Sequence, residues 1–404
     1  MAKKQTIAVF FGGRSPEHDV SIVTALQVMA ALDPDIYNVL PVYLSTNGLW
    51  WCGDSLRQKA TYLPGPEQYA RLTQVVLDIT AYGKPLLVGR DISFLRRSAN
   101  FKFDVAMLAF HGPNGEDGQI QGMFETAGIP YTGMRTMASA VLMDKVATKR
   151  ILATTGIPML PYRELRRPTE GFLITETELS IHTSDFPGPW CVKPSHLGSS
   201  IGVARAETLQ ELADALLEAF KYDTAVVVEP FIDNMVEYNI AVSKVFGDVR
   251  TSAIERPEKV NKLLDFKQKY LTSGIDKMSG TKVLGQSASD GMLSMTRELN
   301  PQLHNGHESD IRKWAEIVFD TVVGSGAPRI DFIVDKKTDE IWLNEVNPCP
   351  GSFSYFLWEA SNKNFILFSD LLDALITEAL NESARVKQPD DPTLVNARLF
   401  SRRR

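Results

Sequence analysis

Two short apolar segments near the C-terminus restrict the fold of this chain most, because together they predict a β-hairpin with oxygen ligands on both strands. Arg329-Ile-Asp331 begins the first segment and Glu345-Val-Asn347 ends the second, with Asp331 and Glu345 fourteen residues apart. Apolar residues flank both motifs and a polar stretch at 335–340 separates them, as is typical of two strands joined by a turn. Glu345 and Asn347 are two residues apart and therefore share one face of their strand.

The register of this hairpin decides whether its two strands can hold one cation. We expect Val334 to pair with Ile341. That register places Asp331 opposite Asn344, within one residue of Glu345. Carboxylates from both strands then meet one ion, and an oxygen-only ligand set favours magnesium or manganese over zinc. A hairpin with one solvated carboxylate on each strand is the simpler alternative.

Two further details favour a binding site. Arg329 lies in an otherwise apolar strand and requires an anion nearby. Pro350-Gly351 follows the second strand, and a glycine there lets the backbone approach a ligand closely. We therefore predict a magnesium-nucleotide site at the hairpin.

Composition and charge exclude several other classes of protein. The 404 residues are 44% hydrophobic, which is enough for two or three domains with cores of their own. A net charge of -6 argues against nucleic acid or an anionic membrane as the main partner. The 3 cysteines are widely spaced, which favours a reducing cytoplasm over a disulfide framework. We expect neither a cleavable export signal nor a membrane-spanning segment.

Alternating strand and helix patterns predict an α/β organisation. The segments 7–11 and 103–110 are predicted strands, and each precedes a loop and an amphipathic helix, which favours a parallel sheet. Ser15, followed by Pro16, is expected to cap the first of these helices. We predict an N-terminal α/β domain at 1–133, a central subdomain at 134–233, a C-terminal subdomain with the metal site at 234–385 and a flexible tail at 386–404.

Neither common nucleotide-binding fingerprint is present, so ATP has to be held in another way. Lys193 ends a predicted strand and precedes a Gly/Ser loop at 198–202, which can close over phosphates with its backbone N–H groups. An ordinary hairpin loop gives the same pattern. Lys145, on a separate predicted helix, is a second candidate phosphate cation. Glu229, at the end of another strand, is a candidate acceptor for the adenine amino group, although single carboxylates at strand ends are common.

The combination of motifs resembles one enzyme family. In chain order the motifs are Gly12-Gly13-Arg-Ser-Pro-Glu17, His111-Gly-Pro-Asn-Gly-Glu-Asp-Gly118, Met143-Asp-Lys145, Lys193-Pro with Gly198-Ser199-Ser200, Lys269-Tyr270 and the hairpin with Pro350-Gly351. Over roughly residues 5–360 they resemble the D-alanine:D-alanine ligases, which are ATP-grasp enzymes. The resemblance implies an α/β ATP-grasp fold, with an N-terminal parallel-sheet (pre-ATP-grasp) domain and two α+β subdomains that enclose ATP.

The resemblance also implies the reaction and its participants. ATP would activate D-alanine, or a similar small amino acid, as an acyl phosphate, and the amine of a second D-alanine would take the acyl group, for peptidoglycan precursor synthesis in the cytoplasm. Two ions, Mg²⁺ or Mn²⁺, would be held by Asp331, Glu345 and Asn347. The implied catalytic residues are Glu17, Ser199, Tyr270, Arg329 and Gly351, and the implied ATP-binding residues are Lys145, Lys193, Ser200, Glu229, Ile232, Glu237 and Lys269. Family likeness alone implies a homodimer.

The acceptor side departs from the family pattern. Phe353 and Phe356 stand where family members usually have Thr and Ser, and a phenyl ring cannot donate a hydrogen bond to the carboxylate of the second amino acid. A different acceptor, such as another amino acid, an amine or a hydroxy acid, is therefore an alternative, with Ser352, Ser354 or Glu359 lining the changed pocket. An inactive nucleotide-binding protein is a third reading. Turnover and the identity of the product distinguish the three.

Overall fold

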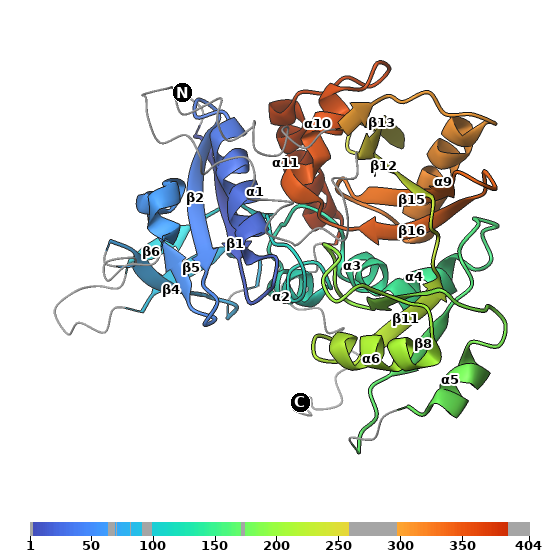
Figure 1. Cartoon of the computed structure of the whole chain (residues 1–404). Coiled ribbons are helices and arrows are strands. Elements are labelled where there is room, and N and C mark those ends of the chain that lie inside the picture. The colour runs from blue at the N-terminus through green and yellow to red at the C-terminus, as the bar shows by residue number, and fades with distance from the viewer. Residues whose placement is uncertain are drawn as a thin grey trace, which may run out of the picture.

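Three β-sheets and the helices packed on them make up the part of the chain that the computed structural model describes (Figure 1). That part consists of residues 3–63, 69, 71–80, 82–90, 99–170, 174–257 and 297–386. Lys269, Tyr270 and residues 387–404 of the predicted tail lie outside it. Among the described helices, none is long and apolar enough to cross a membrane.

The N-terminal sheet combines a parallel part with an antiparallel part, in the strand order β6-β5-β4-β3-β2-β1-β7. Its strands are β1 (Gln5–Gly12), β2 (Tyr37–Leu44), β3 (Trp50–Cys52), β4 (Thr73–Leu77), β5 (Leu86–Gly89), β6 (Asn100–Lys102) and β7 (Val105–Leu108). The predicted parallel pairing is confirmed for β1 with β2 and with β7. From β2 to β6 the ladder is antiparallel. Connections as short as residues 45–49 have no room for the crossover that a parallel neighbour needs.

Two antiparallel sheets follow, with the strand orders β10-β9-β11-β8 and β14-β13-β12-β15-β16. The strands of the four-stranded sheet are β8 (Arg163–Arg166), β9 (Trp190–Pro194), β10 (Ala204–Ala206) and β11 (Ala225–Pro230). Those of the five-stranded sheet are β12 (Met235–Ser243), β13 (Arg250–Pro257), β14 (Arg297–Leu299), β15 (Arg329–Asp335) and β16 (Ile341–Asn347). Figure 1 shows these two sheets on one side of the molecule and the N-terminal sheet on the other.

Helices cover the sheets through four buried apolar clusters. The described helices are α1 (His18–Ala31), α2 (Gln119–Ala127), α3 (Thr136–Met143), α4 (Lys145–Leu152), α5 (Glu176–His182), α6 (Leu209–Ala219), α9 (His307–Thr321), α10 (Tyr355–Glu359) and α11 (Phe368–Arg385), with the 3-10 helices η1 (Asp54–Arg57), η2 (Lys59–Tyr62) and η3 (Gly351–Ser354). α1 and α11 pack on one face of the N-terminal sheet and α2 on the other. α5 and α6 cover the four-stranded sheet, whereas α3, α4 and α9 cover one face of the five-stranded sheet.

The start of α1 differs from its predicted capping. The helix begins at His18 with Glu17 as its N-cap residue, and no side chain caps it. Ser15 instead accepts a hydrogen bond from the Glu17 N–H over 3.0 Å, which closes a turn in front of the helix. Glu17 is therefore the residue immediately before the helix, and it is only 7% exposed.

Core packing groups the start of the predicted central subdomain, after the boundary at 133/134, with the five-stranded sheet. Met134, Leu142 and Leu152 share a buried cluster with Ile330 of β15. The four-stranded sheet has a separate cluster of its own, built around Val192. The positions of the domain boundaries stay predictions.

Candidate active site

The β15–β16 hairpin contains a β-bulge that improves the predicted geometry. Val334 pairs with Ile341 as expected, but the register shifts between Phe332 and Asp331. Asp331 therefore lies directly opposite Glu345 rather than opposite Asn344, as the regular count predicted. A bulge places one extra residue on one strand, so a register counted at a strict period of two is off by one residue beyond it. The two carboxylates face each other across the strands.

Arg329 finds its anion within its own strand. Its guanidinium binds the Asp331 carboxylate through two hydrogen bonds of 2.7 Å each. Burial raises the pKa of Asp331 to about 7 although the Arg329 charge opposes this, and Glu237 and Glu345 raise it further. The Asp331 charge in turn holds the pKa of Arg329 well above its ordinary value, against the effect of burial. Arg329 therefore stays charged and paired with Asp331.

The donor atoms of the hairpin fit a hard cation. Asp331 and Glu345 supply carboxylates from the two strands. The Asn347 side-chain oxygen is buried and has no hydrogen-bond partner among the residues that the structure describes. Buried oxygens normally have a partner, and a metal ion can take that place. No group of three His, Cys, Asp or Glu side chains with metal-binding geometry occurs in the described ranges, and the third oxygen here comes from an amide. Two carboxylates and an amide suit magnesium or manganese.

Two lysines from other elements reach the same face. Lys145, the first residue of α4, places its Nζ 3.1 Å from Glu345 Oε2 and donates a 2.6 Å hydrogen bond to the Leu197 carbonyl. Lys193, near the end of β9, donates to Asn344 Oδ1 over 2.9 Å. Burial works against the charge of Glu345, but Lys145 and Lys193 lower its pKa below the ordinary value. The lysines thus converge on the hairpin from the four-stranded sheet and from α4.

Glu229 lies in a buried ion-pair network that the sequence did not reveal. Its carboxylate lies 2.8 Å from Lys193 Nζ and 2.6 Å from Lys149 Nζ. Burial opposes its charge, but the two lysines lower its pKa to about 2. Lys149 is four residues after Lys145 on the same helix, so the helical repeat was the one signal for it. Neighbouring positions proposed for ATP are partly exposed, with Ile232 after β11 and Glu237 on β12 opposite Ile333.

The Gly/Ser loop reaches the N-terminal domain. Ser199 donates a hydrogen bond to Glu17 Oε1, which joins residues 182 positions apart. Gly198 permits this approach, because a Cβ there would lie 3.3 Å from Glu17 Oε1. Burial raises the pKa of Glu17, while Ser199 and Lys145 lower it. Ser200 lies beside Ser199 on the exposed side of the loop.

A histidine anchors the base of this loop. His196 Nδ1 lies 3.0 Å from Asp223 Oδ1, and its Nε2 lies 3.3 Å from Asp144 Oδ2. Asp144 also caps α4 by accepting hydrogen bonds from the Val146 and Ala147 N–H groups. Asp144 and then Asp223 raise the pKa of His196 to about 10. The charged imidazole therefore connects the loop to the helix that carries Lys145.

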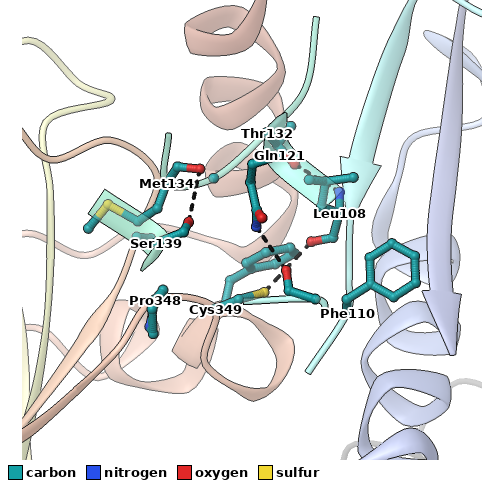
Figure 2. Close-up of a pocket in the computed structure, with 12 residues that line it drawn as sticks. Leu108, Phe110, Gln121, Thr132, Met134, Ser139, Pro348 and Cys349 are labelled. Carbon is teal, nitrogen blue, oxygen red and sulfur yellow. Dashed lines mark hydrogen bonds between the residues drawn. The ribbon is translucent and has the colours of Figure 1, made fainter. Parts of the chain in front are cut away.

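The loop at 111–118 supports the turn after the hairpin. Glu116 accepts hydrogen bonds from the Cys349 N–H over 3.0 Å and the Gly112 N–H over 2.6 Å. Burial raises its pKa well above the ordinary value, and the Glu17 charge adds to the effect. Figure 2 shows the small cavity behind this turn, where Cys349 approaches the Leu108 carbonyl and Gln121 donates to the Gly115 carbonyl. Pro348 and Cys349 line this cavity, whereas Asp331 and Glu345 do not.

Two family models match the chain. The model described as D-ala D-ala ligase N-terminus matches residues 6–134, and the model described as D-ala D-ala ligase C-terminus matches residues 151–377. The chain belongs to the D-alanine–D-alanine ligase family. This is a family of ATP-dependent ligases with the ATP-grasp fold, so the predicted family, fold and enzyme class are confirmed.

Named relatives from the D-alanine–D-alanine ligase family match this chain over nearly their whole length. The D-alanine–D-alanine ligase of Enterococcus faecalis is 34% identical over 389 residues, which cover 93% of this chain and 99% of that protein. The structure of the D-alanine-D-alanine ligase from Coxiella burnetii is 25% identical with a TM-score of 0.74, covering 95% of this chain and 96% of that one. The structure of the VanG D-Ala:D-Ser ligase from Enterococcus faecalis is 26% identical with a TM-score of 0.71, covering 93% and 100%.

Within this D-alanine–D-alanine ligase fold, the residues after Gly351 pack inward. Phe353 and Phe356 belong to the buried cluster beneath α11. Ser352 donates a hydrogen bond to Gln27, and Glu359 accepts one from the Phe368 N–H at the start of α11. The candidates for a changed acceptor pocket thus have structural partners in two cases. Ser354 is buried, with a hydroxyl that has no hydrogen-bond partner among the described residues.

Proposed function

We propose that this chain uses ATP to join D-alanine, activated at its carboxylate, to a second D-alanine in the cytoplasm, as a step of peptidoglycan precursor synthesis. One observation carries the proposal: Lys145, Lys193 and Arg329 converge on the face where Asp331 opposes Glu345. A site that must bring a carboxylate next to a triphosphate needs this concentration of cations. The names of the relatives supply the substrate pair.

The chemistry has two steps. A carboxylate oxygen of the first substrate attacks the γ-phosphorus of ATP, and ADP leaves. The amine of the second substrate then attacks the acyl carbon, the carbon–nitrogen bond forms, the carbon–oxygen bond to phosphate breaks and the amine loses a proton. Both steps bring anions together and the second develops an oxyanion, so fixed positive charge and N–H donors lower both barriers.

We assign the side chains to these demands. Arg329 and the Gly351 N–H donate to the oxyanion, and Lys145 and Lys193 neutralise phosphate. Glu17, held by Ser199, binds the ammonium of the first substrate. Tyr270 extends this link and Lys269 adds a phosphate contact, both outside the described residues. Ser200, Glu229, Ile232 and Glu237 complete the ATP site.

Asp331, Glu345 and Asn347 are the proposed ligands of two Mg²⁺ or Mn²⁺ ions. The buried Asn347 oxygen, which no residue of the described ranges hydrogen-bonds, supports this assignment. When bound, the ions neutralise phosphate charge. Arg329 and Glu345 keep their charges in the buried site, as the directions of their pKa shifts require.

A second candidate function keeps the chemistry and changes the acceptor. The burial of Phe353 and Phe356 favours it, because neither ring can hold the acceptor carboxylate. One relative acts, by its name, as a D-Ala:D-Ser ligase. We also propose a homodimer, on family likeness alone.

The test is a coupled assay of ADP release with mass spectrometry of the product. D-alanine with magnesium and ATP is expected to give ADP and D-alanyl-D-alanine in equal amounts. A product formed only when D-serine, D-lactate or an amine is added would favour the second candidate. Binding of ATP without ADP release under every acceptor would overturn both and leave a nucleotide-binding protein.

A further inference from the structure

A row of directly paired residues crosses the five-stranded sheet from the hairpin to β14, and all of them are polar except the last. Residues that pair directly across neighbouring strands share a face. By the strand registers, this row consists of Glu345, Asp331, Asn239, Glu255 and Leu299. Ile240, Ile254 and Ile330 alternate with it and face the buried cluster under α9. The row therefore lies on the face that carries the proposed chemistry.

Arg297 adds a cation at the far end of this row. It is two residues before Leu299 on β14 and so shares its face. Its Nη1 lies 3.0 Å from Glu255 Oε2, and its guanidinium carbon lies 4.1 Å from the centre of the Phe356 ring. Only 11% of the Arg297 side chain is exposed. An arginine placed between a carboxylate and an aromatic face is held in one orientation.

Glu255 lies between Arg297 and the hairpin, because it pairs with Asn239, which in turn pairs with Asp331. Its Oε1 accepts a 3.2 Å hydrogen bond from Asn239 Nδ2. The Asn239 oxygen is buried and receives no hydrogen bond from any residue in the described ranges, so it is available to an N–H donor. Glu255 and Asp331 lie two strands apart, which is roughly 10 Å.

We propose that Arg297 binds the carboxylate of the second, acceptor amino acid, with Glu255 and Phe356 as the residues that position it. The inference rests on the proposed ligase function and names the acceptor class as α-amino or α-hydroxy acids with a free carboxylate. An α-amino acid bound this way has its amine on the side of Asn239 and Asp331, toward the acyl group at Arg329. A guanidinium carries five N–H donors in a planar fork, so it can hold a carboxylate beside an ion pair.

Phe356 is therefore a support for the acceptor site rather than a loss from it. A phenyl ring cannot donate to an anion, but its face holds the guanidinium that can. A purely structural role for Arg297, fastening β14 to β13 and α10, predicts a different result. It would affect every substrate equally, because the acceptor carboxylate would not touch it.

The experiment compares acceptors with and without a free carboxylate. D-alanine is the donor. D-alanine and D-serine are the acceptors with a carboxylate, D-alaninamide is the acceptor without one, and each product is measured by mass. Arg297→Met removes the charge, and Arg297→Lys keeps the charge without the fork. Arg256→Met is the matched control, because Arg256 pairs with Glu298 at the adjacent step of the same ladder and on its other face.

In Arg297→Met, the KM for D-alanine or D-serine as the acceptor should rise about 10- to 100-fold, as expected when a hydrogen bond to a charged group is lost. The KM for D-alaninamide and for ATP should not change, and Arg297→Lys should show a smaller rise with the same selectivity. Arg256→Met should resemble the parent. Equal effects on acid and amide acceptors, no effect in either Arg297 variant, or a parent that uses only D-alaninamide would overturn the proposal.

A trapping assay separates this inference from the proposed function. Hydroxylamine converts an acyl phosphate to a hydroxamate, so the D-alanyl hydroxamate formed from D-alanine, ATP and excess hydroxylamine reports the first step and does not depend on how the acceptor carboxylate is bound. Arg297→Met should form D-alanyl hydroxamate at the parent rate. Normal hydroxamate formation with no acceptor selectivity overturns the Arg297 assignment alone, whereas a parent that forms no hydroxamate overturns the ligase function and this inference together.

Discussion

Asp331, which is buried, and Glu345, which is partly exposed, are two carboxylates on one face, and their shared negative charge requires cations. Arg329 takes both oxygens of Asp331, and Lys145 takes one oxygen of Glu345. Even so, burial keeps the pKa of Asp331 near 7. Like charges at close range in a dry site are costly, so the proposed metal ions have an electrostatic reason to bind here.

Asp331→Asn and Glu345→Gln are expected to lower kcat by about 100-fold or more. Each removes a carboxylate that would hold the metal ions, and those ions neutralise the phosphate that is transferred. Glu340→Gln changes an exposed carboxylate at the turn of the same hairpin and should leave kcat unchanged. Steady-state ADP release measures all three. Full activity in both hairpin variants would remove the metal assignment.

Lys149 holds a buried charge rather than touching substrate. Lys149→Met leaves Glu229 with Lys193 as its one remaining described ion-pair partner, and we expect a loss of about 3 kcal/mol in the free energy of unfolding. Lys221→Met breaks an exposed pair with Glu218 and should cost less than about 1 kcal/mol. Urea denaturation compares them. Equal stability of the two variants would show that the buried pair contributes nothing.

At the scale of elements, the loop at 195–203 is held at its base and at its tip. Its base is bound to α4 through His196 and Asp144, and its tip is bound to Glu17 through Ser199. Ser199 and Ser200 have positive φ angles of 53° and 58°. This conformation is unfavourable for residues other than glycine, so neighbouring contacts must maintain it. The anchor at the base thus supports the geometry at the tip.

The anchor makes stability depend on pH. The two aspartates raise the pKa of His196 from its ordinary range near 6.5 to about 10, so the folded state binds the proton more tightly. This contribution is fully present below about pH 6.5 and is lost as pH rises through about 10. His196→Gln should therefore reduce the unfolding free energy at pH 6 and have a smaller effect at pH 10, in urea titrations. His182→Gln, on the exposed side of α5, should show no such trend, and a pH-independent His196→Gln effect would contradict the account.

The elements differ in how far the sequence predicts them. Alternating apolar residues predicted the β15–β16 hairpin and the strand at Trp190, because local periodicity records which face is buried. The predicted register assumed unbroken alternation and so missed the bulge at Asn344, where the core-facing residues pass from Leu343 to Val346. Local periodicity also could not pair Glu229 with Lys149, because 80 residues separate them and only the fold brings them together.

At the scale of the whole molecule, the candidate site lies where the three sheets meet. Glu17 comes from the N-terminal domain, Lys193 from the four-stranded sheet and Asp331 from the five-stranded sheet. α11, the last described helix, packs beside α1, the first, on the N-terminal sheet, so buried contacts join the N-terminal and C-terminal parts of the described chain. Motif order along the chain predicted which residues belong to the site. Their mutual placement depends on packing between sheets, which no local pattern encodes.

The central claim is that the chain activates a carboxylate by transferring phosphate to it. The most direct measurement follows oxygen from D-alanine labelled with ¹⁸O in its carboxylate, incubated with magnesium and ATP, by ³¹P NMR of the released phosphate. Attack of the carboxylate on the γ-phosphorus, followed by cleavage of the carbon–oxygen bond, predicts one labelled oxygen in phosphate for each dipeptide formed. Phosphate released without label while dipeptide accumulates would contradict the acyl phosphate and with it the account of this site.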